Sequence, residues 1–299
     1  MQNLSNNKIK KFRTVPQHYD PNTKTFKIDF DIFEKSINNN TRLLFLCNPN
    51  NPFTNIYTKE EYEKITEIIR KFPKIRVMED LAYFPYLLNN KKITYFASIG
   101  DNYVRTISSF SLAKVFGVTG SRLGLTFGSK ENIERLSSTF LCNFPLSSPL
   151  EQMIFSHDLD SSFLPYEKYE NYWTFLAKDT EIRFNRLNDI LKKYNLKTIT
   201  PEGTYYIIIN VENYKDLIPE EFYKELGSNK RINEVDKAFC RMLLSEGVGT
   251  FPMTACQNWD VKLDNFVRIA ANRTFEDFEI VDSALSKISK KLKTSNSKF

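Results

Sequence analysis

SSFSLAKVFGVTGSRLGLTFG, residues 108–128, is the stretch from which the fold can be worked out. Its composition predicts a strand over residues 104–109, a polar turn, and a second strand over residues 123–128. The turn holds one lysine, Lys114, between an alanine and a valine. Removing an ammonium group from water disfavours its charged form, so this setting favours a neutral, nucleophilic amine.

Two polar residues flank this lysine. Ser111 lies three positions before it and Arg122 eight positions after it. A hydroxyl and a guanidinium can hold a phosphate while the amine forms an imine with an aldehyde. Pyridoxal 5'-phosphate (PLP) carries both groups, so the spacing is compatible with a PLP site. An ordinary surface loop with a serine, a lysine and an arginine is the alternative that this stretch leaves open.

The composition is that of a globular chain and argues against several classes of protein. The 299 residues are 41% hydrophobic and 26% charged, which allows a large core. The net charge of +6 is dispersed and forms no nucleic-acid-binding pattern. Four scattered cysteines and two histidines argue against a disulfide scaffold or a metal site, and favour a reducing, cytoplasmic compartment. The sequence shows no signal peptide and no run of ~18 apolar residues, so no membrane partner is expected.

The first half of the chain alternates short β-rich runs with helical patterns, as in a parallel sheet with crossover helices. The predicted elements are a strand over 11–16, a helix over 30–37, a strand over 42–47, a helix over 59–71 and a strand from 76. In such sheets, ligands bind beyond the carboxyl ends of the strands. The residues at three of these ends are Asn51, then Asp80 with Tyr83, then Lys114 with Ser111. We expect them to converge, although each alone also fits a turn, a cap or packing.

The second half of the chain changes character after a long helical pattern over residues 167–194. The later elements are predicted as strands over 203–210, 248–251 and 266–270, a helix over 236–245, and a final helix capped by Thr274 with Asp277. Residues 214–234 are polar and are predicted to form an excursion loop. Arg268 alternates with apolar neighbours in its strand, where it can clamp a carboxylate. The alternative is an arginine that faces solvent.

Taken together, these segments resemble the fold-type I PLP-dependent aminotransferases of class I/II. The matching segments are NPNNP (48–52), DLAY (80–83), SLAK (111–114) followed by Arg122, PEGTYY (201–206) and FVRIA (266–270). They occur in the family's order and cover nearly the whole chain. The run GTFPMTA (249–255) is most similar to the kynurenine/glutamine transaminase branch.

The resemblance implies a role for each of the singled-out residues. Lys114 would form the PLP aldimine and then act as the base, and Asp80 would keep the pyridine nitrogen protonated. Asn51 and Tyr83 would contact the phenolic oxygen. Ser111 and Arg122 would hold the phosphate. Arg268, together with Asn51, would bind the substrate, and Arg268 would hold its α-carboxylate.

The resemblance also implies an architecture and a reaction. We expect a PLP-binding large domain over residues 1–165, with a three-layer α/β/α, mostly parallel sheet. A connector helix and a smaller α+β domain are expected over residues 166–299. The reaction would move an amino group from an amino acid to a 2-oxo acid, in a homodimer.

Two departures from the family pattern leave alternatives open. The family has the pattern PxGGYF, and here Thr204 replaces the second glycine. Family members also carry roughly a hundred residues before the first predicted strand, including a phosphate loop, so the large domain is expected to be incomplete at its start. A cysteine-conjugate β-lyase that uses the same lysine and aspartate, or a truncated non-catalytic relative, are the alternative functions.

Overall fold

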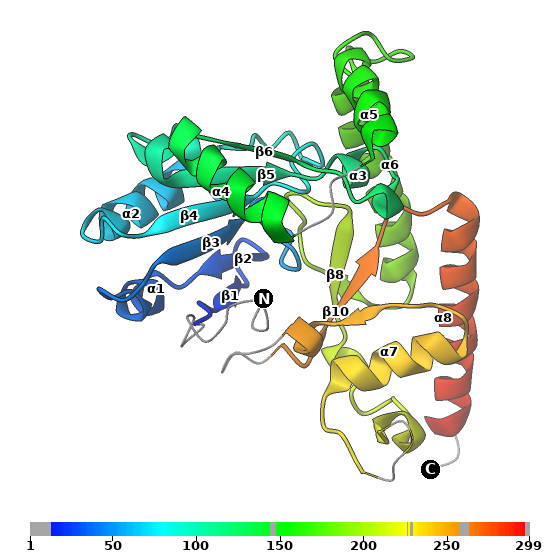
Figure 1. Ribbon diagram of the computed structural model, residues 1–299. Helices are drawn as coiled ribbons and strands as arrows, with labels where there is room; N and C mark the ends of the chain where they lie inside the picture. The colour runs from blue at the N-terminus through cyan, green and yellow to red at the C-terminus, as the bar shows by residue number, and fades with distance from the viewer. Residues whose placement is uncertain (1–12, 144–147, 226, 228–229, 257–262, 297–299) are drawn as a thin grey trace.

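Two sheets organise the chain, each with its own helices and apolar core. The structure is a computed structural model that describes residues 13–143, 148–225, 227, 230–256 and 263–296. Figure 1 shows the first sheet on the left, in blue to green, and the second below and to the right, in yellow to red. The boundary placed at residue 165 stays a prediction.

The first sheet has the strand order β3-β4-β5-β6. Its strands are β3 (Leu43–Cys47), β4 (Arg76–Asp80), β5 (Thr106–Phe110) and β6 (Leu125–Gly128). The first three run parallel, whereas β6 is antiparallel to β5. The predicted α/β class with a mostly parallel sheet is therefore confirmed.

Local signals in the sequence explain where the first helices begin. Helix α1 (Phe30–Ser36) starts behind Asp29, whose side chain accepts the N–H of Ile32. Helix α2 (Lys59–Arg70) starts with the reciprocal pair Thr58 and Glu61, at 3.1 and 2.8 Å. In both helices these side chains accept hydrogen bonds from backbone N–H groups that have no partner within the helix. Helix α2 then buries Tyr62, Ile65 and Ile69 in a core that includes Leu46 and Val77 of the sheet.

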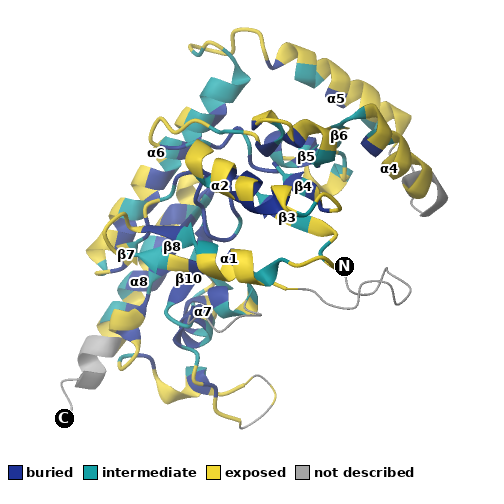
Figure 2. Ribbon diagram, turned by 90° about the vertical axis from the view of Figure 1, so that its left-hand side faces the viewer, coloured by how far each residue is buried: buried dark blue, intermediate teal, exposed yellow. Residues whose placement is uncertain are grey.

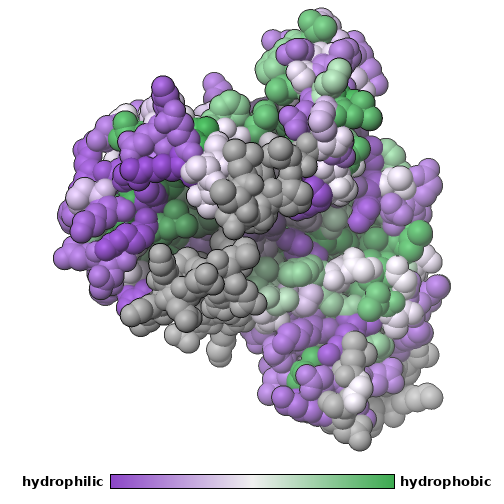
Figure 3. All heavy atoms as spheres, viewed as in Figure 1, coloured by the Kyte–Doolittle hydropathy of each residue, from purple (hydrophilic) through white to green (hydrophobic). Residues whose placement is uncertain are grey.

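The opposite face of β3 is open. Leu43 is 54% exposed and Phe45 is 40% exposed. Figure 3 shows hydrophobic atoms in a hollow of this side of the molecule, where Figure 1 places β3 and β4. Helix α4 (Lys130–Asn143) contacts β5 and β6 instead. Within the described residues no helix covers Leu43 and Phe45, so the expected third layer is missing at this strand.

The second sheet is antiparallel and has the order β7-β8-β10-β9. Its strands are β7 (Lys197–Thr198), β8 (Tyr206–Asn210), β9 (Phe251–Pro252) and β10 (Phe266–Ala270). The helices are α6 (Tyr172–Lys193), α7 (Val235–Ser245) and α8 (Phe275–Asn296). Figure 2 shows much of β8 and α7 as buried, in contrast to the exposed α4 and α5 (Pro149–Ser161). Alternate residues of β8 and β10 point toward these helices. Ile207, Val267 and Ile269 therefore belong to the core between the sheet and the helices.

Two predictions about local structure are wrong. Residues 13–16 form no strand, while residues 11 and 12 lie outside the described part. The first strand is β1 (Gln17–Asp20), because it pairs with β2 (Thr25–Ile28) across a tight turn. Residues 214–234 are not a simple polar loop either. Within them Tyr214, Ile218 and Tyr223 are buried against the second core, because the apolar residues of that segment recur often enough to pack.

No helix among the described residues is long and apolar enough to cross a membrane. The short helix α3 (Leu112–Val115) connects β5 to the turn before β6, and it carries the lysine that the sequence singled out.

Candidate active site

Lys114 lies on α3, directly after the end of β5. Its neighbours Ala113 and Val115 are buried, and the lysine itself is half-buried. The amine Nζ donates a 2.7 Å hydrogen bond to the hydroxyl of Tyr83 and lies 4.4 Å from the centroid of that ring. The buried sides of the helix therefore fix the lysine so that its amine meets the phenol.

Tyr83 is the centre of the cluster. Its hydroxyl contacts Lys114 Nζ, Asn51 Nδ2 at 3.3 Å and the Tyr206 hydroxyl at 3.3 Å. Only 2% of the residue is exposed. Burial, followed by the hydrogen bond with Tyr206, raises the pKa of Tyr83, so it stays a neutral phenol. It can therefore both accept and donate a hydrogen bond in this site.

Arg268 reaches the same cluster from the other sheet. It lies on β10 between the buried Val267 and Ile269, so its side chain leaves the opposite face of the strand. Its Nη1 donates to Oδ1 of Asn51. The guanidinium carbon is 4.0 Å from the ring centroid of Tyr206 and 4.5 Å from that of Phe251. Two aromatic faces therefore hold the cation in place.

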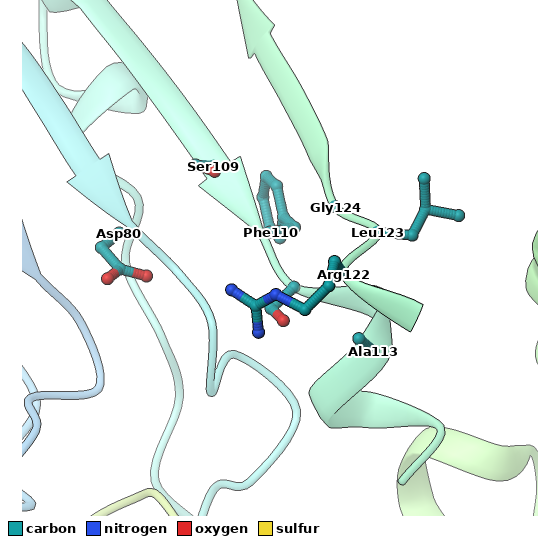
Figure 4. Close-up of a pocket in the computed structure, with 8 residues that line it drawn as sticks. Asp80, Ser109, Phe110, Ala113, Arg122, Leu123 and Gly124 are labelled. Carbon is teal, nitrogen blue, oxygen red and sulfur yellow. The ribbon is translucent and has the colours of Figure 1, made fainter. Parts of the chain in front are cut away.

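Asp80 and Arg122 line a pocket next to this cluster (Figure 4). The pocket has a volume of about 200 Å³, and its other lining residues are Ser109, Phe110, Ser111, Ala113, Leu123 and Gly124. In Figure 4 the guanidinium of Arg122 points into the pocket on the side of the Asp80 carboxylate. One cation, one carboxylate and two hydroxyls thus converge on a space beyond the strand ends.

The charge state of Asp80 depends on what fills this pocket. Burial raises the pKa of the Asp80 carboxyl, while the N–H of Ala82, at 3.0 Å, and the positive charge of Lys114 lower it to a smaller extent. Among the described residues, its second oxygen accepts no hydrogen bond. A cationic N–H placed in the pocket would therefore stabilise the carboxylate.

The backbone around Arg122 is built to aim it inward. Arg122 has a φ of +55°, which is an uncommon conformation for a residue with a Cβ. Gly124 follows it, and a Cβ there would lie 2.7 Å from the carbonyl oxygen of Phe110. That separation is shorter than van der Waals contact, so the return of the chain along β5 requires glycine. Gly124 therefore lets the chain that follows Arg122 run close to the end of β5.

All seven residues that the sequence singled out lie around this one region. A continuous set of hydrogen bonds runs from Lys114 through Tyr83 and Asn51 to Arg268. The remaining three, Asp80, Ser111 and Arg122, line the adjoining pocket. Among the described residues no group of three metal-ligating side chains occurs.

Sequence reasoning missed the two aromatic residues that hold Arg268. Tyr206 and Phe251 belong to β8 and β9, on either side of β10. Tyr206 pairs in register with Ala270, two positions from Arg268 and therefore on the same face of the sheet. The β-rich run over residues 203–210 was visible in the sequence, but the register that joins it to Arg268 was not.

The side chains in and beside the pocket match the chemical groups of PLP. A phosphate needs cations and hydroxyls, which Arg122 and Ser111 provide. Among the described residues Arg122 has no acidic partner that would compete. A pyridine nitrogen needs a carboxylate, which Asp80 provides, and an aldehyde needs an amine, which Lys114 provides.

Comparison with known proteins identifies the family of this chain. Residues 4–285 match the family model described as "Aminotransferase class I and II". Kynurenine–oxoglutarate transaminase 3 of Bos taurus is 29% identical over 221 residues, which cover 68% of this chain and 47% of that protein. An aspartate aminotransferase of Pinus pinaster is 28% identical over 236 residues, which cover 79% of this chain and 46% of that protein.

The fold is also found in a solved structure. The structure of N-succinyldiaminopimelate aminotransferase from Mycobacterium tuberculosis superposes with a TM-score of 0.76 at 21% identity, covering 92% of this chain and 65% of that one. The chain thus spans about half the length of the curated relatives that it matches. Its matched residues nevertheless run almost from end to end of the sequence, and the chain belongs to the class I and II aminotransferase family.

Proposed function

We propose that this chain carries the catalytic residues of a PLP-dependent aminotransferase, which moves an amino group from an amino acid to a 2-oxo acid. The observation that supports this most directly is the hydrogen-bonded path from Lys114 to Arg268. This path joins the amine of Lys114, on the helix after the first sheet, to the guanidinium of Arg268, on the second sheet. Family membership implies descent from PLP-dependent transaminases.

PLP, when bound, supplies an electron sink for the bonds of the substrate's α-carbon. Residues of the pocket and of the neighbouring cluster would hold it. Arg122 and Ser111 would bind the phosphate, Asp80 would pair with the pyridine nitrogen, and Asn51 with Tyr83 would donate to the phenolic oxygen. The raised pKa of Asp80, which is due to burial, falls once a cationic N–H pairs with the carboxylate.

Lys114 would move the proton. Its amine hydrogen-bonds to Tyr83, a phenol that can donate to a neutral amine or accept from a charged one. Nζ can therefore take a proton from the α-carbon of the substrate and return it to a neighbouring atom. The apolar packing of Ala113 and Val115 keeps water away from one side of this amine.

Arg268 would fix the substrate. A guanidinium binds a carboxylate through two parallel N–H bonds, which sets the orientation of the α-carbon as well as its affinity. The rings of Tyr206 and Phe251 leave only the edge of the guanidinium for that contact. The names of the similar proteins make kynurenine with oxoglutarate the first substrate pair to test, and aspartate a second amino acid.

The test is to ask which lysine reacts with PLP. The 299-residue chain is incubated with PLP, reduced with borohydride and digested, and the labelled peptide is located by mass spectrometry. We expect the label on Lys114, its loss in Lys114→Ala, and its retention in the control Lys74→Ala, which changes an exposed lysine. A label on any other lysine would refute the assignment.

A second arm of this test addresses the length of the chain. The same reaction is repeated with the chain fused behind the segment that a relative carries before its matching part. Labelling of Lys114 in the fusion alone would mean that the site is intact and needs that segment for affinity. Labelling in neither protein would favour a non-catalytic relative.

Assembly and compartment complete the proposal. The family resemblance supports a homodimer, and light scattering on protein that turns over substrate would test it, since an active monomer contradicts it. The described cysteines Cys47, Cys240 and Cys256 are free thiols, which is compatible with a reducing, cytoplasmic compartment.

A further inference from the structure

Three polar groups lie within 3.3 Å of the Tyr83 hydroxyl, and the phenol of Tyr205 interacts with it as a further neighbour. The hydroxyl has one O–H to donate and two lone pairs that accept. Arg268 has only donors, so the Asn51 atom that it contacts is the oxygen Oδ1. The amide nitrogen of Asn51 is then the group that faces Tyr83, and it donates. Asn51 therefore occupies one lone pair of the phenol permanently.

The second lone pair and the proton of Tyr83 are shared between Lys114 and Tyr206. While Lys114 is an ammonium ion it can only donate, so it occupies the second lone pair. The phenol proton of Tyr83 must then point to the hydroxyl of Tyr206. When Lys114 is a neutral amine, the same proton can turn to Nζ, and Tyr206 can donate in return.

We propose that Tyr206 is a positioning residue that accepts the Tyr83 proton while Lys114 is charged and, through its ring, holds Arg268 in place. The proposal rests on the proposed function, because it takes Lys114 as the reacting amine and Arg268 as the carboxylate clamp. The family pattern PxGGYF has phenylalanine at this position, so the ring is shared with that pattern and the hydroxyl is a property of this chain.

The two halves of the proposal use different atoms of one side chain. The ring of Tyr206 lies 4.0 Å from the guanidinium carbon of Arg268, and the hydroxyl lies 3.3 Å from that of Tyr83. Tyr206→Phe removes the hydroxyl alone. Tyr206→Leu removes both the hydroxyl and the aromatic face.

The first measurement is the reactivity of Lys114 in the chain without PLP. Competitive acetylation with trace acetic anhydride at one pH, followed by peptide mass spectrometry, gives the labelling of every lysine relative to the exposed Lys74. In Tyr206→Phe the Tyr83 proton loses its 3.3 Å partner while Lys114 is charged, so the neutral, reactive amine is favoured. We expect labelling of Lys114 to rise by about tenfold, the effect of one lost buried hydrogen bond.

The second measurement is the reactivity of Arg268 toward phenylglyoxal, read in the same digests. We expect Tyr206→Phe to leave it at the wild-type rate, because the ring is kept. Tyr206→Leu is expected to raise it several-fold, because one aromatic face of the guanidinium is lost. A general loosening of the fold would instead raise the labelling of many lysines and arginines at once.

The control is Tyr103→Phe, which removes the hydroxyl of an exposed tyrosine that donates to the carbonyl of Gly128. It is expected to change neither rate. Unchanged or slower acetylation of Lys114 in Tyr206→Phe would overturn the proposal. A changed rate of Arg268 modification by phenylglyoxal in that variant would also overturn it. Neither rate requires PLP, so failure of borohydride labelling in both the chain and the fusion would count against the proposed function separately.

Discussion

Arg268 donates a hydrogen bond to Asn51, although the two residues are 217 positions apart in the sequence. Asn51 belongs to the turn after β3 of the first sheet, and Arg268 to the central β10 of the second. The site therefore depends on how firmly the two sheets are joined. Nearby, the segment before β8 packs on that same turn, where the N–H of Gly203 donates to the carbonyl of Thr54 at 2.9 Å.

At Gly203 the segment before β8 passes very close to the turn after β3. A Cβ on Gly203 would lie 2.6 Å from Cβ of Pro49 and 3.0 Å from the carbonyl oxygen of Tyr86. Neither a proline ring nor a backbone can move aside cheaply, so Gly203→Ala is expected to lower the free energy of unfolding by about 1–3 kcal/mol. Urea unfolding measures it. Gly249→Ala is the control, because a Cβ there meets nothing within 4 Å; equal stability of the two variants would contradict the close contact.

Replacing Arg268 by lysine tests the aromatic clamp. Lysine keeps the charge but loses the planar fork and its stacking on Tyr206 and Phe251. We expect Arg268→Lys to raise KM for the amino acid about 10- to 100-fold, corresponding to roughly 1.4–2.8 kcal/mol, with a smaller change in kcat. Steady-state kinetics of the PLP-loaded protein measure it. Arg135→Lys, on the exposed side of α4, should leave both constants unchanged; an unchanged KM in Arg268→Lys would exclude the carboxylate role.

Asp236 gives the stability a pH dependence. It is fully buried at the start of α7, where it accepts hydrogen bonds from the N–H and the hydroxyl of Thr254, each at 2.8 Å. Burial outweighs these bonds and raises the pKa of Asp236 from 3.8 to about 6. At a pH between the two pKa values, the carboxyl is protonated in the folded protein and ionised in the unfolded chain. The free energy of unfolding therefore falls as the pH rises from about 4 to about 6.

The size of this effect is at most about 3 kcal/mol, from a shift of roughly two pKa units. Asp236→Asn cannot ionise and should flatten the decline, which urea unfolding at pH 4.5 and pH 7 would detect. Asp216→Asn, at an exposed position, should keep the wild-type slope. A wild-type slope in Asp236→Asn would mean that another group titrates.

How much the sequence could predict depended on the range of the interactions. The start of α2 rests on Thr58 and Glu61, three positions apart, so it was predictable from the chain alone. The grouping of Asn51, Tyr83 and Lys114 was predictable because the carboxyl ends of parallel strands share an edge. The site contacts of Tyr206 were not predictable, because they depend on the register of β8 with β10.

The wrong predictions have the same origin. The strand over 11–16 was inferred from local composition, but a strand needs a partner, and the partner β2 pairs with residues 17–20. The segment 214–234 looked polar because its buried residues, among them Tyr214 and Tyr223, are spaced irregularly. Their packing partners come from other elements, such as Phe239 on α7.

Thr204 replaces a glycine of the family pattern at a position where the backbone favours glycine. Its φ is +69°, which costs a residue with a Cβ about 1–2 kcal/mol and costs glycine nothing. Thr204 is fully buried, its N–H donates to the carbonyl of Tyr86 at 2.9 Å, and its hydroxyl accepts the N–H of Tyr206 at 3.2 Å. The hydroxyl therefore offsets part of the strain and helps to fix the start of β8.

Two substitutions separate the strain from the hydrogen bond. Thr204→Ala loses the bond and keeps the strain, whereas Thr204→Gly loses the bond and relieves the strain. We therefore expect Thr204→Gly to be the more stable of the two by about 1 kcal/mol in urea unfolding. At Thr198, on β7, the order should reverse, because glycine weakens an ordinary strand by about 0.5–1 kcal/mol relative to alanine. If Thr204→Ala were as stable as Thr204→Gly, the backbone at this position would not be strained, and the hydroxyl alone would account for the threonine.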